Sequence, residues 1–202
     1  MSADPERSGV GTFFCNFGRM ARKLSIKEMK RLTREEYLCS ETLPIVTVVD
    51  NVRSLHNVGS IFRTADSLGL RRLVLCGITG TPPHPELHKS ALGAEEVVEW
   101  VHYDRTADAL RELRACGYTT LALEQAEGSL KLGETDLDAI LAQAEGVALV
   151  LGNEVDGVSQ EVIDLCDYCL EIRQYGTKHS MNVSVAGGIA LWSLAHLFRK
   201  KQ

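Results

Sequence analysis

The chain lacks a long apolar run, a surplus of positive charge and a second close pair of cysteines. Its most apolar stretch, residues 183–198, contains Ser184, a Gly187-Gly188 pair and His196, and a membrane helix needs about 20 mostly apolar residues. No apolar leader follows Met1, so we expect neither secretion nor a membrane anchor. The glycosylation sequon at Asn182 is then irrelevant, and a cytoplasmic protein is expected.

The cysteines and histidines do not form a metal-binding pattern. Only Cys166 and Cys169 lie close together among the six cysteines, and no second pair at metal-ligand spacing exists. His84 and His88 are four residues apart, but the residues between them do not fit H-E-x-x-H. Reduced cytosolic thiols and no bound metal are therefore expected.

Acidic residues outnumber basic residues overall, but basic residues are concentrated near the N-terminus. A nucleic-acid-binding protein is usually basic, whereas this chain has a net charge of −5. Residues 19–38 are predicted to be helical, with capping boxes at Ser25/Glu28 and Thr33/Glu36. Their basic residues are either a solvated helix face or a phosphate-attracting arm, which we place at residues 1–40. They are Arg19, Arg22, Lys23, Lys27, Lys30, Arg31 and Arg34.

From residue 44 onward, strands and helices are predicted to alternate. The strands are nearly continuous apolar runs, which favours a mostly parallel sheet with helices on both faces. We expect one α/β domain over residues 41–202. Its strands are predicted at 44–49, 72–77, 97–103, 118–125, 146–152 and 168–173. Its helices are predicted at 57–68, 84–94 (loop and short helix), 106–117, 136–144, 159–167 and 181–198.

Several common active-site motifs are missing. No G-x-G-x-x-G follows a strand, no G-x-S-x-G is present, and Val158 stands where a phosphate loop needs its lysine. Ligands of parallel sheets bind at the carboxyl ends of the strands. The polar loops expected there are "DNVRSLHN", "GNEVDGVS" and "RQYGTKHSMN".

Each of these loops contains residues with a structural and a functional interpretation. Asn57 could cap a helix and Arg63 could be a surface charge, or both could face the strand ends. Glu154 directly follows a buried strand, which is costly unless the carboxylate is partnered. Ser180 and Asn182 precede the last helix, where capping explains one of them more easily than both.

Together the three segments resemble the motifs of the SpoU (TrmH-like) branch of the SPOUT RNA methyltransferases. The matching patterns are N-x-G-x-x-x-R-T-A, then L-x-L-G-N-E-x-x-G-[VL]-S, then I-x-x-x-G-x-x-x-S-[LM]-N-V-S-V-A. The resemblance spans residues 44–198. It implies a C-terminal trefoil knot and a homodimer. It also implies methyl transfer from S-adenosylmethionine to a ribose 2′-hydroxyl of tRNA or rRNA, with S-adenosylhomocysteine as product.

The resemblance assigns roles residue by residue. The catalytic positions are Arg63, Asn57, Glu154, Ser180 and Asn182. The cofactor positions are Leu123, Glu124, Leu151, Gly152, Ile172 and Met181. We add Arg53, Arg173 and Lys178 as RNA contacts. The family's proposal that the arginine is a base conflicts with the permanent charge of a guanidinium, which favours phosphate binding and alkoxide stabilisation instead.

The chain departs from its relatives in three respects. Arg173-Gln174 replaces a common Pro-Met, and Met181 replaces leucine. We expect no ribosomal-protein-like substrate domain, which favours tRNA over rRNA as the substrate. The alternatives are a catalytically silent RNA-binding relative, disfavoured by the intact motif residues, and a methyltransferase acting on other acceptors.

Overall fold

The structure is a computed structural model that describes residues 21–29 and 31–200. It divides into two units, one ending at Thr33 and the other beginning at Arg34. The first contains the 3-10 helix η1 (Ile26–Met29). The main-chain N–H and hydroxyl of Ser25 both donate to the Glu28 carboxylate, at 2.8 and 2.7 Å, so the half of the first capping box in which Glu28 reaches back to the Ser25 N–H is present.

The single helix predicted for residues 19–38 is wrong. Residues 31–33 are not helical, and α1 (Arg34–Leu38) is separate from η1. Short helices depend on tertiary packing for their stability, and α1 has no buried residue. Each capping signal therefore starts only a short helix. Arg19 and Lys30, two of the basic residues, lie outside the described residues.

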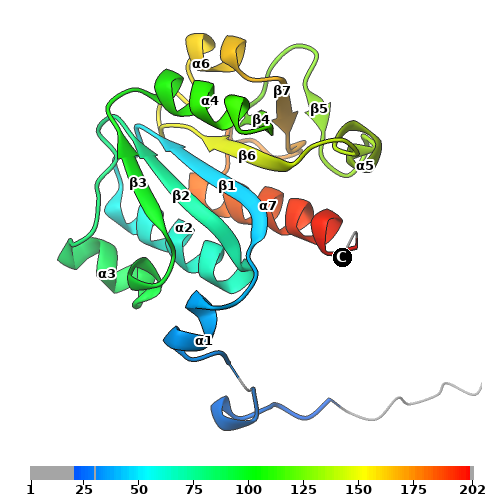
Figure 1. The fold of residues 1–202 in the computed structure, drawn as a ribbon. Helices are drawn as coiled ribbons and strands as arrows, with labels where there is room; N and C mark the ends of the chain where they lie inside the picture. Colours follow the sequence, from blue (N-terminus) through cyan, green and yellow to red (C-terminus); the bar gives the residue numbers. More distant parts are fainter. Residues whose placement is uncertain (1–20, 30, 201–202) are drawn as a thin grey trace, which may run out of the picture. The chain divides into compact units, whose positions relative to one another are not determined.

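The second unit contains a seven-stranded sheet in the order β3-β2-β1-β6-β4-β7-β5 (Figure 1). Every pair of neighbouring strands is parallel. The strands are β1 (Leu43–Asp50), β2 (Leu70–Cys76), β3 (Trp100–Tyr103), β4 (Tyr118–Leu123), β5 (Leu130–Lys131), β6 (Gly146–Leu151) and β7 (Tyr168–Glu171).

Helices cover both faces of this sheet, as predicted. Helices α2 and α7 lie on one face, and α4 and α6 lie on the other (Figure 1). The helices are α2 (Leu55–Leu68), α3 (Pro85–Ala91), η2 (Ala94–Glu96), α4 (Thr106–Ala115), α5 (Leu137–Ile140), α6 (Gln160–Leu165) and α7 (Val183–Lys200). Gly69 ends α2 in the left-handed conformation, with φ of 63°.

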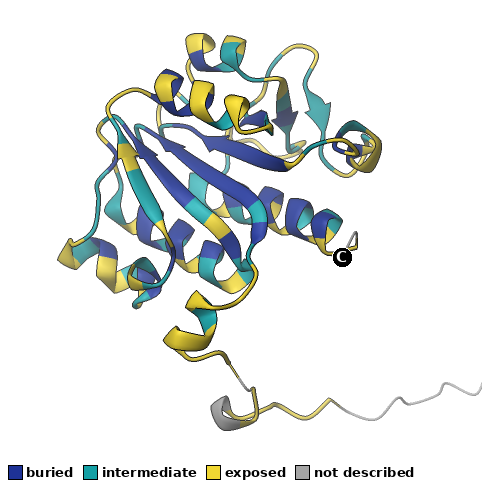
Figure 2. Cartoon of the chain, viewed as in Figure 1, coloured by how far each residue is buried: buried dark blue, intermediate teal, exposed yellow. Residues whose placement is uncertain are grey.

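The apolar runs of the strands fill two cores. Side chains of a strand alternate between its faces, so Ile45 and Val49 of β1 join the core under α2 and α7. Val46 and Val48 join the core under α4 and α6. The central strands are buried along almost their whole length (Figure 2), which explains the absence of alternating polar residues in their sequence.

A few element boundaries differ from the prediction. The strand predicted from residue 97 begins at Trp100, because Val97 and Val98 both donate main-chain hydrogen bonds to Ala94 and complete a turn. The helix predicted for 136–144 ends at Ile140. The two-residue strand β5 is too short to show a periodic pattern and was not predicted.

The sheet places the three polar loops together. The chain runs outward from β1 through β2 to β3, and then continues on the other side of β1, where β6 is its neighbour. Such a change of direction is where parallel sheets bind ligands, beyond the carboxyl ends of the strands. The trefoil knot stays a prediction. No helix in the described residues is both long and apolar enough to cross a membrane.

Candidate active site

A cavity of about 500 Å³ opens at the carboxyl ends of β4, β6 and β7. Every predicted cofactor position lines it: Leu123, Glu124, Leu151, Gly152, Ile172 and Met181. Three of the predicted catalytic positions line it as well: Glu154, Ser180 and Asn182. Its volume lies within the usual range for small-molecule sites.

The lining of the cavity is acidic and partly apolar. It includes the carboxylates of Glu124, Glu154 and Asp156, and none of its lining residues is lysine or arginine. A phosphate group would be repelled there, whereas a cation beside a flat apolar group would be favoured. S-adenosylmethionine has this character, since it combines adenine with a sulfonium, an ammonium and one carboxylate. The cavity therefore fits the expected cofactor.

Glu154 is held by the strand-to-helix turn that follows β1. Its carboxylate accepts hydrogen bonds from the main-chain N–H groups of Arg53 and Ser54, both at 3.0 Å, and from the Asn57 amide at 2.9 Å. Burial opposes ionisation, but these donors outweigh it, so the pKa of Glu154 lies below its ordinary value. The donors of the β1–α2 turn thus provide the partner that the Glu154 carboxylate needs after a buried strand.

Asn57 joins all three segments. Its amide donates to Glu154, and its oxygen accepts a 3.1 Å hydrogen bond from the Asn182 amide. Ser54 is the N-cap of α2, so helix capping does not explain the Asn57 side chain. The chain Glu154–Asn57–Asn182 confirms that the three loops converge.

The Asn182 side chain also contacts the start of α7. Its side-chain oxygen accepts main-chain hydrogen bonds from Ser184 at 2.9 Å and Val185 at 3.4 Å, so it caps α7. Ser180 is exposed at the cavity wall. Capping therefore accounts for Asn182 but not for Ser180.

The loop between β6 and α6 folds back tightly on itself. Asn153 and Gly157 exchange two main-chain hydrogen bonds of 3.0 Å. A Cβ atom built on Gly152 would overlap the main chain of Gly157 and Val158, so only glycine fits there. Glu124 accepts the Val158 N–H at 3.0 Å, which ties this loop to the end of β4.

Two positioning residues of the site were not predicted. The Asn153 amide donates to the Asn51 carbonyl at 2.9 Å, joining the first and second segments. The asparagine four residues before Gly157 is a turn signal that could have indicated it. The Gln125 amide donates to the His179 carbonyl at 2.7 Å and ties the third segment to β4, and no sequence signal points to it.

Arg63 lies in a different hollow. It is exposed on α2 and lines a space with Lys89 of α3 and Trp192 of α7, in a lining without any carboxylate. The two linings share no residue. Within residues 21–29 and 31–200, the Arg63 guanidinium has no hydrogen-bond or ion-pair partner. One chain therefore does not place Arg63 in the cofactor cavity.

The predicted RNA contacts are all exposed and differ in their partners. Arg53 lines a hollow next to the cavity, beside Asp156. Arg173 forms a 3.1 Å ion pair with Glu134. Lys178 is exposed in the third segment. Their exposure is consistent with RNA contact, and their roles stay predictions.

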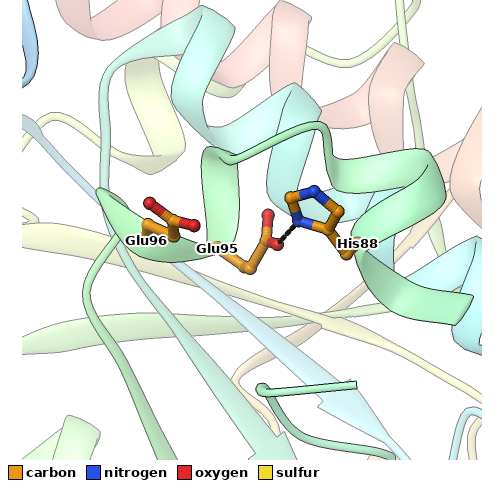
Figure 3. A group of neighbouring side chains, drawn as sticks. All are labelled: His88, Glu95 and Glu96. Carbon is orange, nitrogen blue, oxygen red and sulfur yellow. Dashed lines mark hydrogen bonds and ion pairs between the residues drawn. The ribbon is translucent and has the colours of Figure 1, made fainter. Parts of the chain in front are cut away.

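One group of side chains in the described residues has metal-ligand proximity. The ligand atoms of His88, Glu95 and Glu96 lie within 4.8 Å of one another (Figure 3). His88 is hydrogen-bonded to Glu95 at 2.5 Å, and Glu95 also accepts the Gly93 N–H at 3.0 Å. Glu96 lies 3.6 Å from Arg34. The two Glu95 contacts close the turn between α3 and η2, the Arg34 ion pair links Glu96 to α1, and together they account for the grouping.

Comparison with known proteins gives a consistent answer. The model of the SpoU rRNA Methylase family matches residues 44–192. A curated relative, a 23S rRNA (guanosine-2′-O-)-methyltransferase of Pasteurella multocida, is 30% identical over 88% of this chain and 70% of its own length. The solved TrmH/SpoU tRNA modifying enzyme of Aquifex aeolicus has a TM-score of 0.71 and 28% identity, covering 83% of this chain and 81% of the other. An AdoMet-bound rRNA methyltransferase from Sinorhizobium meliloti has a TM-score of 0.69 and 28% identity, covering 77% and 57%.

Proposed function

The chain belongs to the SpoU rRNA Methylase family, and from that premise we propose that it methylates a ribose 2′-hydroxyl of RNA with S-adenosylmethionine. The observation that supports this most strongly is the hydrogen-bonded chain Glu154–Asn57–Asn182 beside an acidic cavity. It brings together residues from all three matching segments, in the place where the cofactor positions also meet.

The cofactor, when bound, supplies an electrophilic methyl group. A ribose hydroxyl is a poor nucleophile, so the protein must orient it and help its proton leave. Ser180 and Asn182 line the cavity, and we assign to them the hydrogen bonds that orient the ribose. Glu154 is occupied by the β1–α2 turn, so we assign it the role of fixing Asn57, and through it Asn182, in one orientation.

Arg63 supplies the positive charge that the cavity lacks. The hollow of Arg63 and Lys89 contains no carboxylate in its lining, which suits the phosphate next to the reacting ribose. Because this hollow is separate from the cavity within one chain, we propose that the active site is completed by a second copy. Arg63 of one subunit then serves the cofactor cavity of its partner.

The surface that would join the two copies is a stripe on α7. Val185, Ile189 and Trp192 are 53%, 42% and 61% exposed, and His196 stacks on Trp192 with ring centroids 5.5 Å apart. These residues recur at helical spacing, so they lie on one face. Trp192 also lines the Arg63 hollow, which places the stripe next to the charge that has to reach the partner.

We expect the double variant Ile189→Asp/Trp192→Asp to be monomeric, because two carboxylates would have to be buried in the interface. S-adenosylhomocysteine affinity should stay within about twofold, since neither residue lines the cavity. Methyl transfer should fall more than about tenfold. Sedimentation velocity, calorimetry and an activity assay measure the three quantities. Leu92→Asp, a change at an exposed leucine outside α7, is the control. A double variant that stays dimeric contradicts the stripe.

Transfer of a radiolabelled methyl group to RNA tests the function itself. We expect label in RNA from cells that lack the gene, and no label when the acceptor position is 2′-deoxyribose. Label that survives deoxy substitution would mean a base acceptor. No label in any RNA, with cofactor binding intact, would favour a silent RNA-binding protein.

The sequence supports three more specific proposals, which concern the substrate, the location and the N-terminal arm. We propose tRNA ahead of rRNA as substrate, a cytoplasmic location, and a basic arm at residues 1–40 that adds affinity without sequence preference. In the described part of the arm, Arg22 pairs with Glu28 at 2.7 Å. Removing the arm should flatten the salt dependence of RNA binding, which a salt titration of the shortened chain measures.

A further inference from the structure

The third segment contains a side chain that the reaction does not use. Tyr175 is 87% exposed, the largest exposed fraction among the exposed large hydrophobic residues of the described chain. A buried tyrosine ring removes a large apolar area from water, and Tyr175 forgoes that gain. Gly176 beside it has no heavy atom near its Cβ direction, so the space around this part of the loop is open.

The position of Tyr175 relates it to the active site. Gln174 directly before it and His179 four residues after it both line the cavity. The Gln125–His179 hydrogen bond of 2.7 Å holds this loop against the end of β4. Tyr175 therefore belongs to a segment that borders the cavity on both sides of it and is hydrogen-bonded to the end of β4 on one side.

The charge of the same segment is suited to RNA. Residues 172–182, "IRQYGTKHSMN", include Arg173, Lys178 and His179 and no acidic residue, in a chain whose net charge is −5. Arg173 and Lys178 are exposed, and Arg173 also forms the 3.1 Å ion pair with Glu134. An exposed ring between basic side chains is the combination with which proteins hold single-stranded nucleic acid, by stacking on a base and attracting its phosphates.

We propose that Tyr175 stacks on an unpaired base of the substrate RNA, close to the nucleotide that is methylated. This inference rests on the proposed function and adds a base-stacking site to it. A base that stacks there must be free of its own helix, so the substrate is a loop or bulge rather than a continuous duplex.

RNA binding measured over a salt series tests the stacking site. With S-adenosylhomocysteine present, Tyr175→Ala should weaken binding about 5- to 150-fold, the range of losses seen when one base-stacking aromatic is removed. The slope of log affinity against log salt should not change, because no phosphate contact is lost. Lys178→Ala should instead lower that slope by about one.

Two further variants separate stacking from a structural role. Tyr175→Phe should bind RNA about as tightly as wild type, because the ring is retained. Tyr168→Ala removes a tyrosine that is 41% exposed in β7, outside this segment, and should leave the affinity unchanged. Equal affinities of Tyr175→Ala and wild type would overturn the inference, and so would a Tyr175→Ala protein that has lost the dimer or S-adenosylhomocysteine binding. Wild-type protein that neither binds nor methylates RNA would overturn the proposed function instead.

Discussion

Arg63→Ala is expected to lower methyl transfer at saturating cofactor by about 100- to 1,000-fold, the usual cost of removing one group that stabilises developing negative charge. Cofactor affinity should stay within about twofold, because Arg63 is absent from the lining of its own chain's cavity and we assign it to the RNA phosphate and the developing alkoxide rather than to the cofactor. The fold should also survive, since the side chain is exposed and has no hydrogen-bond or ion-pair partner within the described residues. Single-turnover kinetics and calorimetry with S-adenosylhomocysteine measure the two effects separately.

Arg63→Lys is the matched control. Lysine keeps the charge but loses the planar fork that binds phosphate with two hydrogen bonds, so an intermediate rate is expected. A true base would behave differently. Lysine, with a lower pKa than arginine, would then shift the pH profile of the rate toward lower pH. A profile shifted in that way would contradict the electrostatic role that we assign to Arg63.

The location of Arg63 also predicts complementation between two inactive chains. Asn182→Ser keeps a side-chain oxygen to cap α7 but loses the amide that reaches Asn57. Mixed with Arg63→Ala, it forms heterodimers in which one site has an intact arginine and an intact cavity. Random exchange makes half the dimers mixed, so about a quarter of the wild-type activity should return in a symmetric dimer. No recovery, with exchange shown by mass, would mean that Arg63 acts within its own chain.

The sequence was informative about local structure because each local feature has its own signal. Nearly continuous apolar runs, separated by helical segments, predicted the parallel sheet, and Gly69 predicted the end of α2. Residue spacing could not identify the partners of Asn57. Its hydrogen bonds reach Glu154 and Asn182, which are 97 and 125 residues away in the chain. The strand pattern placed the three loops at one edge of the sheet, the motif resemblance indicated that these residues act together, and only the structure shows that Asn57 is the link.

Gly152 and Gly176 also show what the sequence could not predict about the loops. Gly152 and Gly176 are both motif positions, and each interrupts or follows an apolar strand, so the sequence treats them alike. In the structure, Gly152 is buried against the main chain of Gly157 and Val158, whereas a Cβ on Gly176 would meet nothing. Neither has a left-handed backbone conformation. The two glycines differ only in the free space beside their Cα atoms, and that space depends on how each loop folds.

This difference gives the second large expected effect. Gly152→Ala should lower the free energy of unfolding by about 1–3 kcal/mol, the usual cost of overpacking, because the atoms in its way are main chain and cannot rotate aside. The loop 152–158 must shift to admit the methyl group, and six residues of that loop line the cavity. Cofactor affinity should therefore fall more than about tenfold.

Gly176→Ala is the same chemical change in the other loop and should alter the free energy of unfolding by less than about 0.5 kcal/mol. Urea unfolding and calorimetry with S-adenosylhomocysteine on both variants make the comparison. If Gly152→Ala does not fold well enough to titrate, its melting temperature with and without excess cofactor still reports binding, since a ligand raises the stability only of the state that binds it. Equal behaviour of the two variants would mean that the turn after β6 can open without cost, and that the cavity wall is not set by the contact between Gly152 and Gly157.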